Sequence, residues 1–318
     1  MAKTFAFVFP GQGSQSVGML DAWGEHPAVR ETLAEASEAL GEDLGALIHD
    51  GPKEALALTT NTQPVMLVAG VAAWRAWRAE GGPLPAAVAG HSLGEYSALV
   101  ASGVLTLAQA APLVRLRAAA MQEAVPVGAG AMAAILGLPA DKVLEGCRQA
   151  QESFGAGSPE VAEAVNFNDP AQTVIAGTKA GVDRACEVLK GLGAKRALPL
   201  PVSAPFHSSL MRPAAEKLRA ALAATPLAAP AIPVLNNVDV AVRQDADAIR
   251  DALYRQAFGP VRWVECVQAL KTDFGVTHLV ECGPGKVLAG MTRRIDPELV
   301  GASLYDPATL AETKELLA

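Results

Sequence analysis

Apolar residues follow two patterns along this chain, short runs and longer stretches with a helical repeat. Short, mainly apolar runs at residues 3–9, 86–89, 232–235 and 277–281 predict buried strands. The helical repeat predicts helices over 27–80 with breaks near Gly41, Gly51 and Pro64, and over 95–101, 106–124, 210–224, 245–258, 261–274 and 286–295. Strands and helices therefore alternate in both outer parts of the chain, which favours an α/β fold.

The middle of the chain has its own order of elements. After a Gly-rich stretch at 127–130, the pattern predicts a strand, a helix, two strands, a helix and a strand, at 131–136, 139–151, 161–168, 172–176, 178–192 and 195–200. The order βαββαβ is that of the split ferredoxin-like unit. We therefore expect a small domain at 128–206, inserted into a large domain formed by 1–127 and 207–318.

Composition narrows the class of protein. Of 318 residues, 51% are hydrophobic and 19% are charged, which is typical of a globular protein with a sizeable core. The net charge of −7 argues against a general nucleic-acid binder. The longest apolar run, 65–74, falls well short of the roughly 20 residues that span a bilayer. The apolar stretch at 3–9 is too short for the core of a signal peptide and is followed by no A-x-A site. We expect a cytoplasmic protein that does not enter membranes.

The four cysteines predict no metal or redox site. They lie at positions 147, 186, 266 and 282, and no two of them have C-x-x-C spacing. Buried free thiols are the expected state.

One turn carries the clearest chemical signal. Residues 90–94 read Gly-His-Ser-Leu-Gly, between a predicted strand and a predicted helix. Glycine at both ends removes the Cβ atoms that would clash in a tight strand-to-helix turn. Ser92 is then a predicted nucleophile, and the Leu93 N–H at the helix start can receive the developing oxyanion. The alternative is a turn that only caps the helix; the flanking strand and helix favour the catalytic interpretation.

Arg117 is unusual because it shares a helix face with apolar residues. Its neighbours three and four positions away are Leu113, Val114, Ala120 and Met121. A guanidinium on an inward face is costly unless it meets an anion. Either a protein carboxylate or a substrate carboxylate could be that anion, and the residues alone leave both open.

His207 is the best candidate for the base that takes a proton from Ser92. It lies in a polar, Pro-containing loop at the start of a predicted helix. His91 adjoins Ser92, and a neighbour in such a turn is expected to point elsewhere. His278 lies in an apolar strand, as a structural histidine would. The proposed pair of Ser92 and His207 is the arrangement that nucleophilic catalysis requires.

Several motifs occur together and in one order between about residues 9 and 293. They are PGQGSQ, NTQPVM, GHSLGEYSALVASG, VNFNDPAQTVIAG, SAPFHSSLM, VLNNVD, RQAFGPVRW and ECGPGKVLAGM. This set resembles the malonyl-CoA:acyl-carrier-protein transacylase family, which also includes acyltransferase domains of polyketide and fatty-acid synthases. The resemblance implies an α/β hydrolase-like large domain with a parallel sheet and an inserted ferredoxin-like small domain.

The resemblance also implies roles for individual residues. It matches Ser92 to the nucleophile, His207 to the general base and acid, and Arg117 to the group that binds the malonyl carboxylate. The backbone N–H groups of Gln12 and Leu93 match the oxyanion hole of the family. The backbone carbonyl of Gln256 matches the group that orients His207. Gln63 and Asn166 match polar residues near the substrate.

The expected activity is transfer of malonyl from malonyl-CoA to the phosphopantetheine thiol of acyl carrier protein, by a ping-pong route through malonyl-serine. The resemblance implies a role in fatty-acid synthesis and a coenzyme A thioester as substrate. We expect no cofactor and no metal, and nothing in the sequence demands more than a monomer. The alternatives are an acyltransferase of polyketide synthesis, a serine thioesterase or esterase, and a carrier-binding subunit without activity.

Overall fold

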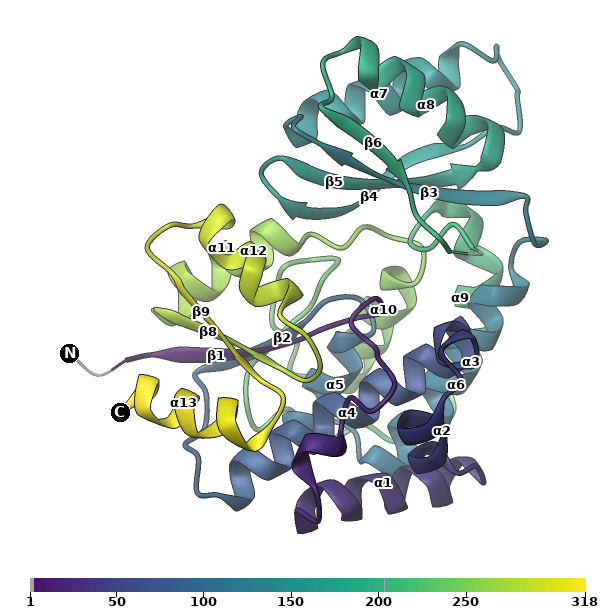
Figure 1. Ribbon diagram of the computed structural model, residues 1–318. Helices are drawn as coiled ribbons and strands as arrows, with labels where there is room; N and C mark the ends of the chain where they lie inside the picture. Colours follow the sequence, from purple (N-terminus) through teal and green to yellow (C-terminus); the bar gives the residue numbers. More distant parts are fainter. Residues whose placement is uncertain (1–2, 203) are drawn as a thin grey trace.

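The computed structural model describes residues 3–202 and 204–318 and has two domains, a large one and a small one stacked on it (Figure 1). Ser203, within the predicted histidine loop, lies outside the described residues. Among the described residues, no helix is both long and apolar enough to cross a membrane.

Five parallel strands form the sheet of the large domain. Their order is β7 (Val234–Leu235), β2 (Ala87–Gly90), β1 (Phe5–Phe9), β8 (His278–Cys282) and β9 (Val300–Leu304). The first four overlap the four strands predicted in the outer parts of the chain, and the fifth was not predicted. Because the strands are parallel, all their carboxyl ends lie along one edge, where loops from distant parts of the sequence meet.

Strand β1 shows why both faces of this sheet are buried. Side chains alternate between the two faces of a strand. Phe5, Phe7 and Phe9 pack into one hydrophobic core, while Ala6 and Val8 pack into the other. A strand that is buried on both faces is apolar throughout, which explains the unbroken run at 5–9.

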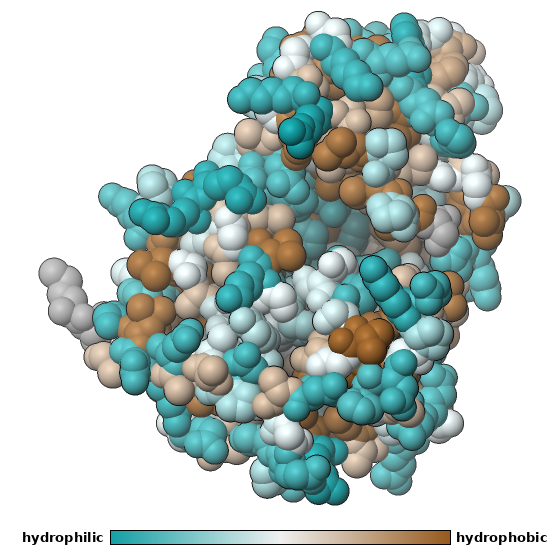
Figure 2. Space-filling view, viewed as in Figure 1, coloured by the Kyte–Doolittle hydropathy of each residue, from teal (hydrophilic) through white to brown (hydrophobic). Residues whose placement is uncertain are grey.

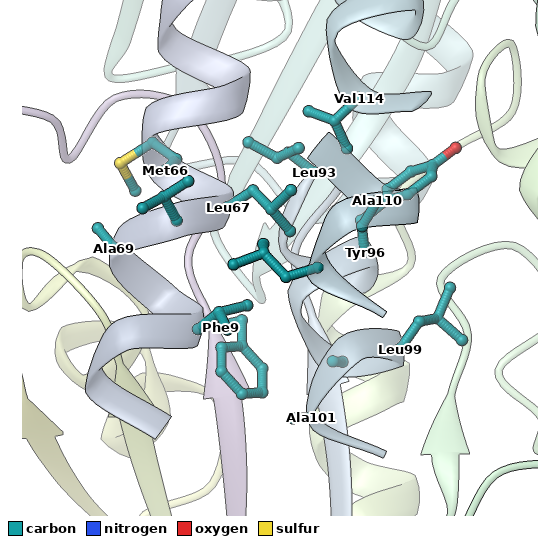
Figure 3. Close-up of a cluster of buried hydrophobic side chains, with 14 of the residues drawn as sticks. Phe9, Met66, Leu67, Ala69, Leu93, Tyr96, Leu99, Ala101, Ala110 and Val114 are labelled. Atoms are coloured by element: carbon teal, nitrogen blue, oxygen red, sulfur yellow. The ribbon is translucent and has the colours of Figure 1, made fainter. Parts of the chain in front are cut away.

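Helices cover the two faces of the sheet. The helices of the large domain are α1 (Pro27–Leu40), α2 (Leu44–Asp50), α3 (Lys53–Ala57), α4 (Thr59–Ala79), α5 (Gly94–Ala101), α6 (Leu107–Glu123), α9 (Arg212–Ala224), α10 (Ala246–Gln256), α11 (Trp263–Phe274), α12 (Val287–Ile295) and α13 (Pro307–Leu317), with two 3₁₀ turns at Asp21–Trp23 and Ser209–Met211. Figure 3 shows α4, α5 and α6 packing together beside β1. Helices α11 and α12 cover the opposite face.

The expected helix break at Pro64 is wrong, because α4 runs from Thr59 through Pro64 to Ala79. Proline has no N–H, so the carbonyl four residues earlier loses its helical partner. That carbonyl belongs to Thr60, and the Arg115 side chain donates to it at 2.6 Å. A tertiary contact from α6 thus satisfies the group that proline leaves unpaired.

The small domain has the predicted βαββαβ order. Its elements are β3 (Gly130–Leu136), α7 (Ala140–Glu152), β4 (Ala162–Asp169), β5 (Gln172–Thr178), α8 (Lys179–Gly191) and β6 (Arg196–Pro199). The sheet is antiparallel with the order β4-β5-β3-β6, and α7 and α8 cover one of its faces (Figure 1). The ferredoxin-like arrangement is confirmed, while the boundaries at 128 and 206 stay a prediction.

Backbone hydrogen bonds join the two domains beside the site described below. The Val261 N–H donates to the Val165 carbonyl at 2.8 Å, and the Phe167 N–H donates to the Val261 carbonyl at 3.0 Å. Strand β4 is thereby held against the segment that precedes α11. The contact places Asn166, which lies between those two residues of β4, at the junction of the domains.

Candidate active site

Ser92 lies in a tight turn between β2 and α5. Its backbone φ is 54°, in the left-handed region that residues with a Cβ rarely adopt. A Cβ on Gly90 would lie 1.9 Å from the carbonyl carbon of Gly94, and a Cβ on Gly94 would lie 2.0 Å from the Phe9 carbonyl oxygen. Both glycines are therefore required by close approach of backbone, and the turn lifts the Ser92 side chain into a cavity.

His207 also lines this cavity and contacts the Ser92 hydroxyl. Its Nε2 lies 2.7 Å from Ser92 Oγ, and its Nδ1 lies 2.9 Å from the Gln256 carbonyl and 3.2 Å from the Gly259 carbonyl. Since a carbonyl oxygen can only accept, Nδ1 carries the proton. Nε2 is then free to accept the Ser92 proton, which is the tautomer that a general base needs.

Arg117 points from α6 toward the same hydroxyl and is almost completely buried. Its Nη1 donates to Gln63 Oε1 at 2.6 Å, and its Nη2 donates to Gln256 Oε1 at 3.0 Å and to Ser92 Oγ at 3.3 Å. Within 3–202 and 204–318, no carboxylate forms an ion pair with it. The hydrogen-bond partners of the guanidinium are therefore neutral, and the buried carboxyl of Glu95 acts on it without forming an ion pair, so its charge remains available to an anionic ligand.

A cavity of about 420 Å³ surrounds the Ser92 hydroxyl at the junction of the two domains, where the surface in Figure 2 is hollowed. Seven of the eight predicted site residues line it, and they are Gln12, Gln63, Ser92, Leu93, Arg117, Asn166 and His207. The eighth, Gln256, lies behind Ser92 and is fully buried. The walls include the apolar side chains of Met121, Met132, Val202 and Phe206.

The expected oxyanion hole uses the backbone N–H groups of two residues that line this cavity. Among the described residues, neither the Gln12 N–H nor the Leu93 N–H has a hydrogen-bond partner. The Gln12 side chain instead donates to Thr59 Oγ1 at 3.2 Å. Two unpaired donors beside a nucleophile are what an oxyanion requires.

His91 lines the same cavity, although the sequence suggested that it would point elsewhere. Its Nε2 lies 2.8 Å from Asn168 Oδ1, so its ring is held by β4. Asn166, two residues earlier in β4, has a buried Oδ1 without a partner among the described residues. The small domain thus contributes polar groups to a cavity whose nucleophile lies in the large domain.

Burial controls the protonation of His207. Loss of solvent, with the positive charge of Arg117 as a further cause, lowers the pKa of His207 from 6.5 to about 3. The imidazole is therefore neutral at physiological pH and can act as a base. Burial likewise lowers the pKa of Arg117, although this group remains the nearest positive charge to Ser92.

This shift predicts an unusual pH profile for the reactivity of Ser92. Labelling by a serine-directed fluorophosphonate should show no change caused by His207 from about pH 8 to about pH 5, because folded His207 stays neutral until its pKa near 3. Glu95, which has a pKa of about 7 and contacts Gln256, titrates in that range, so the profile is measured for the parent and for Glu95→Gln. The unfolded chain takes up that proton near 6.5, so this group also lowers folding stability as pH falls below 6.5. A thermal melt at each pH therefore accompanies the labelling. A step in the labelling rate near pH 6.5 that persists in folded Glu95→Gln would contradict the assignment.

Two buried polar residues near Ser92 had no predicted role. Asn237 Oδ1 accepts from the Ser92 N–H at 2.8 Å, and Glu95 Oε2 accepts from Gln256 Nε2 at 3.0 Å. Burial raises the pKa of Glu95 to about 7. The signals in the sequence were a carboxylate within an apolar helix and the polar pair in VLNNVD directly after a short strand.

Comparison with known proteins agrees with this geometry. The acyl transferase domain family matches residues 6–294. The malonyl CoA-acyl carrier protein transacylase of Salmonella typhimurium is 54% identical over 308 residues, which cover 96% of this chain and 97% of that protein. An acyl-carrier-protein S-malonyltransferase from Burkholderia pseudomallei has a crystal structure that is 64% identical, with a TM-score of 0.94 and coverage of 98% and 99%.

A third relative was solved with its partner bound. It is a malonyl-transacylase in complex with a type II PKS acyl-carrier protein, 50% identical with a TM-score of 0.94, covering 99% of this chain and 100% of that one. These matches extend over the whole of both domains. The chain belongs to the acyl transferase family and, within it, to the malonyl-CoA:acyl-carrier-protein transacylases.

Proposed function

We propose that this protein transfers a malonyl group from malonyl-CoA to the phosphopantetheine thiol of acyl carrier protein, through a malonyl ester of Ser92, and so supplies malonyl units for fatty-acid synthesis. The observation that carries the proposal is the Arg117 guanidinium, held 3.3 Å from Ser92 Oγ without a protein carboxylate among the described residues. In a site for neutral acyl groups, a buried positive charge beside the nucleophile would cost free energy without gaining a ligand.

The first half-reaction follows from the contacts of Ser92. As Oγ attacks the thioester carbonyl, its proton passes to His207 Nε2, which lies 2.7 Å away. The carbonyl oxygen becomes an oxyanion and accepts from the Gln12 and Leu93 N–H groups. The carbon–sulfur bond then breaks, and the coenzyme A thiolate leaves with the proton from His207.

The second half-reaction reverses these steps with a different thiol. The phosphopantetheine thiol of the carrier gives its proton to His207 and attacks the malonyl carbonyl. The ester bond to Oγ breaks, and His207 returns the proton to Ser92. Throughout, the carbonyls of Gln256 and Gly259 favour a proton on Nδ1 and stabilise the imidazolium that forms in each half-reaction.

Arg117 supplies the selectivity in this proposal. Arg117 lines the cavity, and its two terminal nitrogens are held by Gln63 and Gln256. A guanidinium can bind a carboxylate through two parallel hydrogen bonds, which lysine cannot do. The free carboxylate of malonyl is the group that distinguishes this donor from acetyl-CoA.

The direct test is the intact mass of the protein after brief mixing with malonyl-CoA. We expect a malonyl-sized gain that is absent in Ser92→Ala and is discharged when holo acyl carrier protein is added. A gain that decays equally fast without carrier would identify a thioesterase. Folded protein that gains no mass would contradict the proposal, and the same assay with carriers from fatty-acid and polyketide systems would compare the two acceptors.

A further inference from the structure

Asn237 occupies a distinctive position at the carboxyl edge of the parallel sheet. Strand β7 pairs with β2 in the register Ala89 to Leu235, so the residue two positions after β7 comes level with His91, the neighbour of Ser92. Asn237 is that residue, and its side chain is completely buried. The sheet register therefore brings it beside Ser92 although the two are 145 positions apart in sequence.

The side-chain amide of Asn237 makes two hydrogen bonds to the turn at 90–94 that carries Ser92. Its Oδ1 accepts from the Ser92 N–H at 2.8 Å, and its Nδ2 donates to the Gly90 carbonyl at 2.7 Å. The left-handed backbone of Ser92 leaves its N–H without a partner in any strand or helix, so an acceptor from elsewhere is needed. One amide satisfies both this donor and the carbonyl at the end of β2.

Glu95, in the first turn of α5, ties Asn237 to the other groups of the site. Its Oε2 accepts from the Asn237 backbone N–H at 2.9 Å and from Gln256 Nε2 at 3.0 Å. Gln256 Nε2 also donates to the Ser92 carbonyl at 2.9 Å. The Gln256 side-chain oxygen accepts from Arg117, and its backbone carbonyl accepts from His207. All three reactive groups are thus linked to this one buried carboxyl through Gln256 or Asn237.

We propose that Asn237 and Glu95 are positioning residues. Asn237 holds the Ser92 backbone in its left-handed conformation, and Glu95 holds Asn237 and Gln256 in their orientations. Together they keep Ser92 Oγ within hydrogen-bonding distance of His207 and Arg117. Neither residue lines the cavity around Ser92, so neither is assigned a contact with substrate. The inference rests on the proposed acyl transfer and adds the groups that keep its geometry in place.

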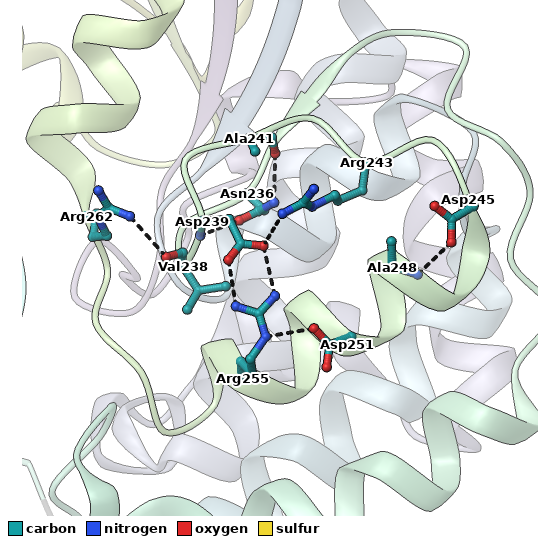
Figure 4. A network of polar contacts seen from close by, with 10 residues as sticks. All are labelled: Asn236, Val238, Asp239, Ala241, Arg243, Asp245, Ala248, Asp251, Arg255 and Arg262. Atoms are coloured by element: carbon teal, nitrogen blue, oxygen red, sulfur yellow. Dashed lines mark hydrogen bonds and ion pairs between the residues drawn. The ribbon is translucent and has the colours of Figure 1, made fainter.

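The neighbouring Asn236 offers a matched control. Its Nδ2 donates to the Ala241 carbonyl at 2.7 Å and its Oδ1 accepts from the Asp239 N–H at 2.8 Å (Figure 4). It is buried and makes two hydrogen bonds of the same kind as Asn237, but neither of them involves Ser92. A general loss of loop stability should therefore affect Asn236→Ala and Asn237→Ala alike.

The first experiment compares these two variants in single turnover. We expect Asn237→Ala to lower the rate constant of malonyl-serine formation at saturating malonyl-CoA by about 10²-fold, because small displacements of a nucleophile have effects of that size. Asn236→Ala should retain the parent rate constant, with a similar change in melting temperature. Equal rate constants in the two variants would overturn the proposal.

A second pair of variants tests Glu95 and covers the case in which Asn237→Ala does not fold. Glu95→Gln keeps an oxygen that can accept from both the Asn237 N–H and Gln256 Nε2, whereas Glu95→Leu removes it. We expect Glu95→Gln to acylate within about threefold of the parent and Glu95→Leu to lose about 10²-fold. Equal losses in both, or no loss in Glu95→Leu, would overturn the proposal.

Labelling of Ser92 by a fluorophosphonate separates this inference from the proposed function. The reagent reports the reactivity of the Ser92 and His207 pair and needs no malonyl group. If the parent protein is labelled but never malonylated, the proposed function fails, and slower labelling of Asn237→Ala than of Asn236→Ala still supports the positioning role. Equal labelling of these two variants would contradict that role whatever the acyl donor.

Discussion

Replacing His207 by alanine should lower the rate constant of malonyl-serine formation by about 10⁴-fold, while Ser92 and Arg117 remain in place. Among the described residues no second imidazole contacts the Ser92 hydroxyl, because the other imidazole of the cavity, His91, is held by Asn168. Without Nε2 the Ser92 proton has no neutral acceptor among the described groups that contact its hydroxyl, since Arg117 can only donate. Rapid-quench mass spectrometry after mixing with malonyl-CoA measures the rate.

His278→Gln is the control for loss of a buried imidazole. His278 lies at the amino end of β8, whereas Ser92 follows the carboxyl end of β2, two strands away in the same parallel sheet. We expect this variant to acylate at the parent rate. Added imidazole should restore part of the activity of His207→Ala if the alanine leaves room for it. Acylation of His207→Ala at the parent rate would remove His207 from the mechanism.

The second large effect is expected on the choice of acyl donor. Arg117→Ala should lower kcat/KM for malonyl-CoA by about 10²- to 4 × 10³-fold, because a buried carboxylate without a partner costs roughly 3–5 kcal/mol and each 1.4 kcal/mol is about tenfold. Acetyl-CoA has no carboxylate and gains from removal of an unpaired buried charge. The ratio of the two kcat/KM values, measured in competition, should therefore shift strongly toward acetyl-CoA.

Arg115→Ala provides the matched control on the same helix. Arg115 contacts the Thr60 carbonyl, Asn61 and Glu42, and it does not line the cavity. Its loss should lower stability without changing the preference between donors. Arg117→Lys should keep part of the malonyl preference, since a charge remains but the two parallel hydrogen bonds do not. Unchanged malonyl preference in Arg117→Ala would show that another group binds the carboxylate.

The loop after β7 shows how these groups are supported from a distance. Asp239 pairs with Arg255 through two hydrogen bonds of 2.6 and 2.8 Å, and Arg243 lies 2.9 Å from the same carboxylate (Figure 4). The hydrogen bonds from Arg255 are the main reason that the pKa of Asp239 falls to about 2. The carboxylate of Asp239 thereby ties the loop after β7 to α10 through Arg255.

The sequence by itself determined the features that depend on local backbone. The apolar run of β1, the βαββαβ order of the small domain and the glycines on either side of the Ser92 turn could all be predicted, because apolar patterning and a missing Cβ act within a few residues. The order of motifs along the chain was enough to indicate the family. Segments without a strong pattern, such as β9 and α13, were not predicted.

Only the tertiary structure decided how the chemistry is assembled. Ser92 and His207 are 115 positions apart, and Ser92 and Asn237 are 145 apart. Sequence spacing also could not show that Arg117 lacks a carboxylate partner among the described residues, or that Arg115 would satisfy the carbonyl freed by Pro64. Each of these contacts depends on which side chains meet when the helices and the parallel sheet pack together. A residue pattern encodes the faces of each element, whereas partners across the fold arise only when the elements pack.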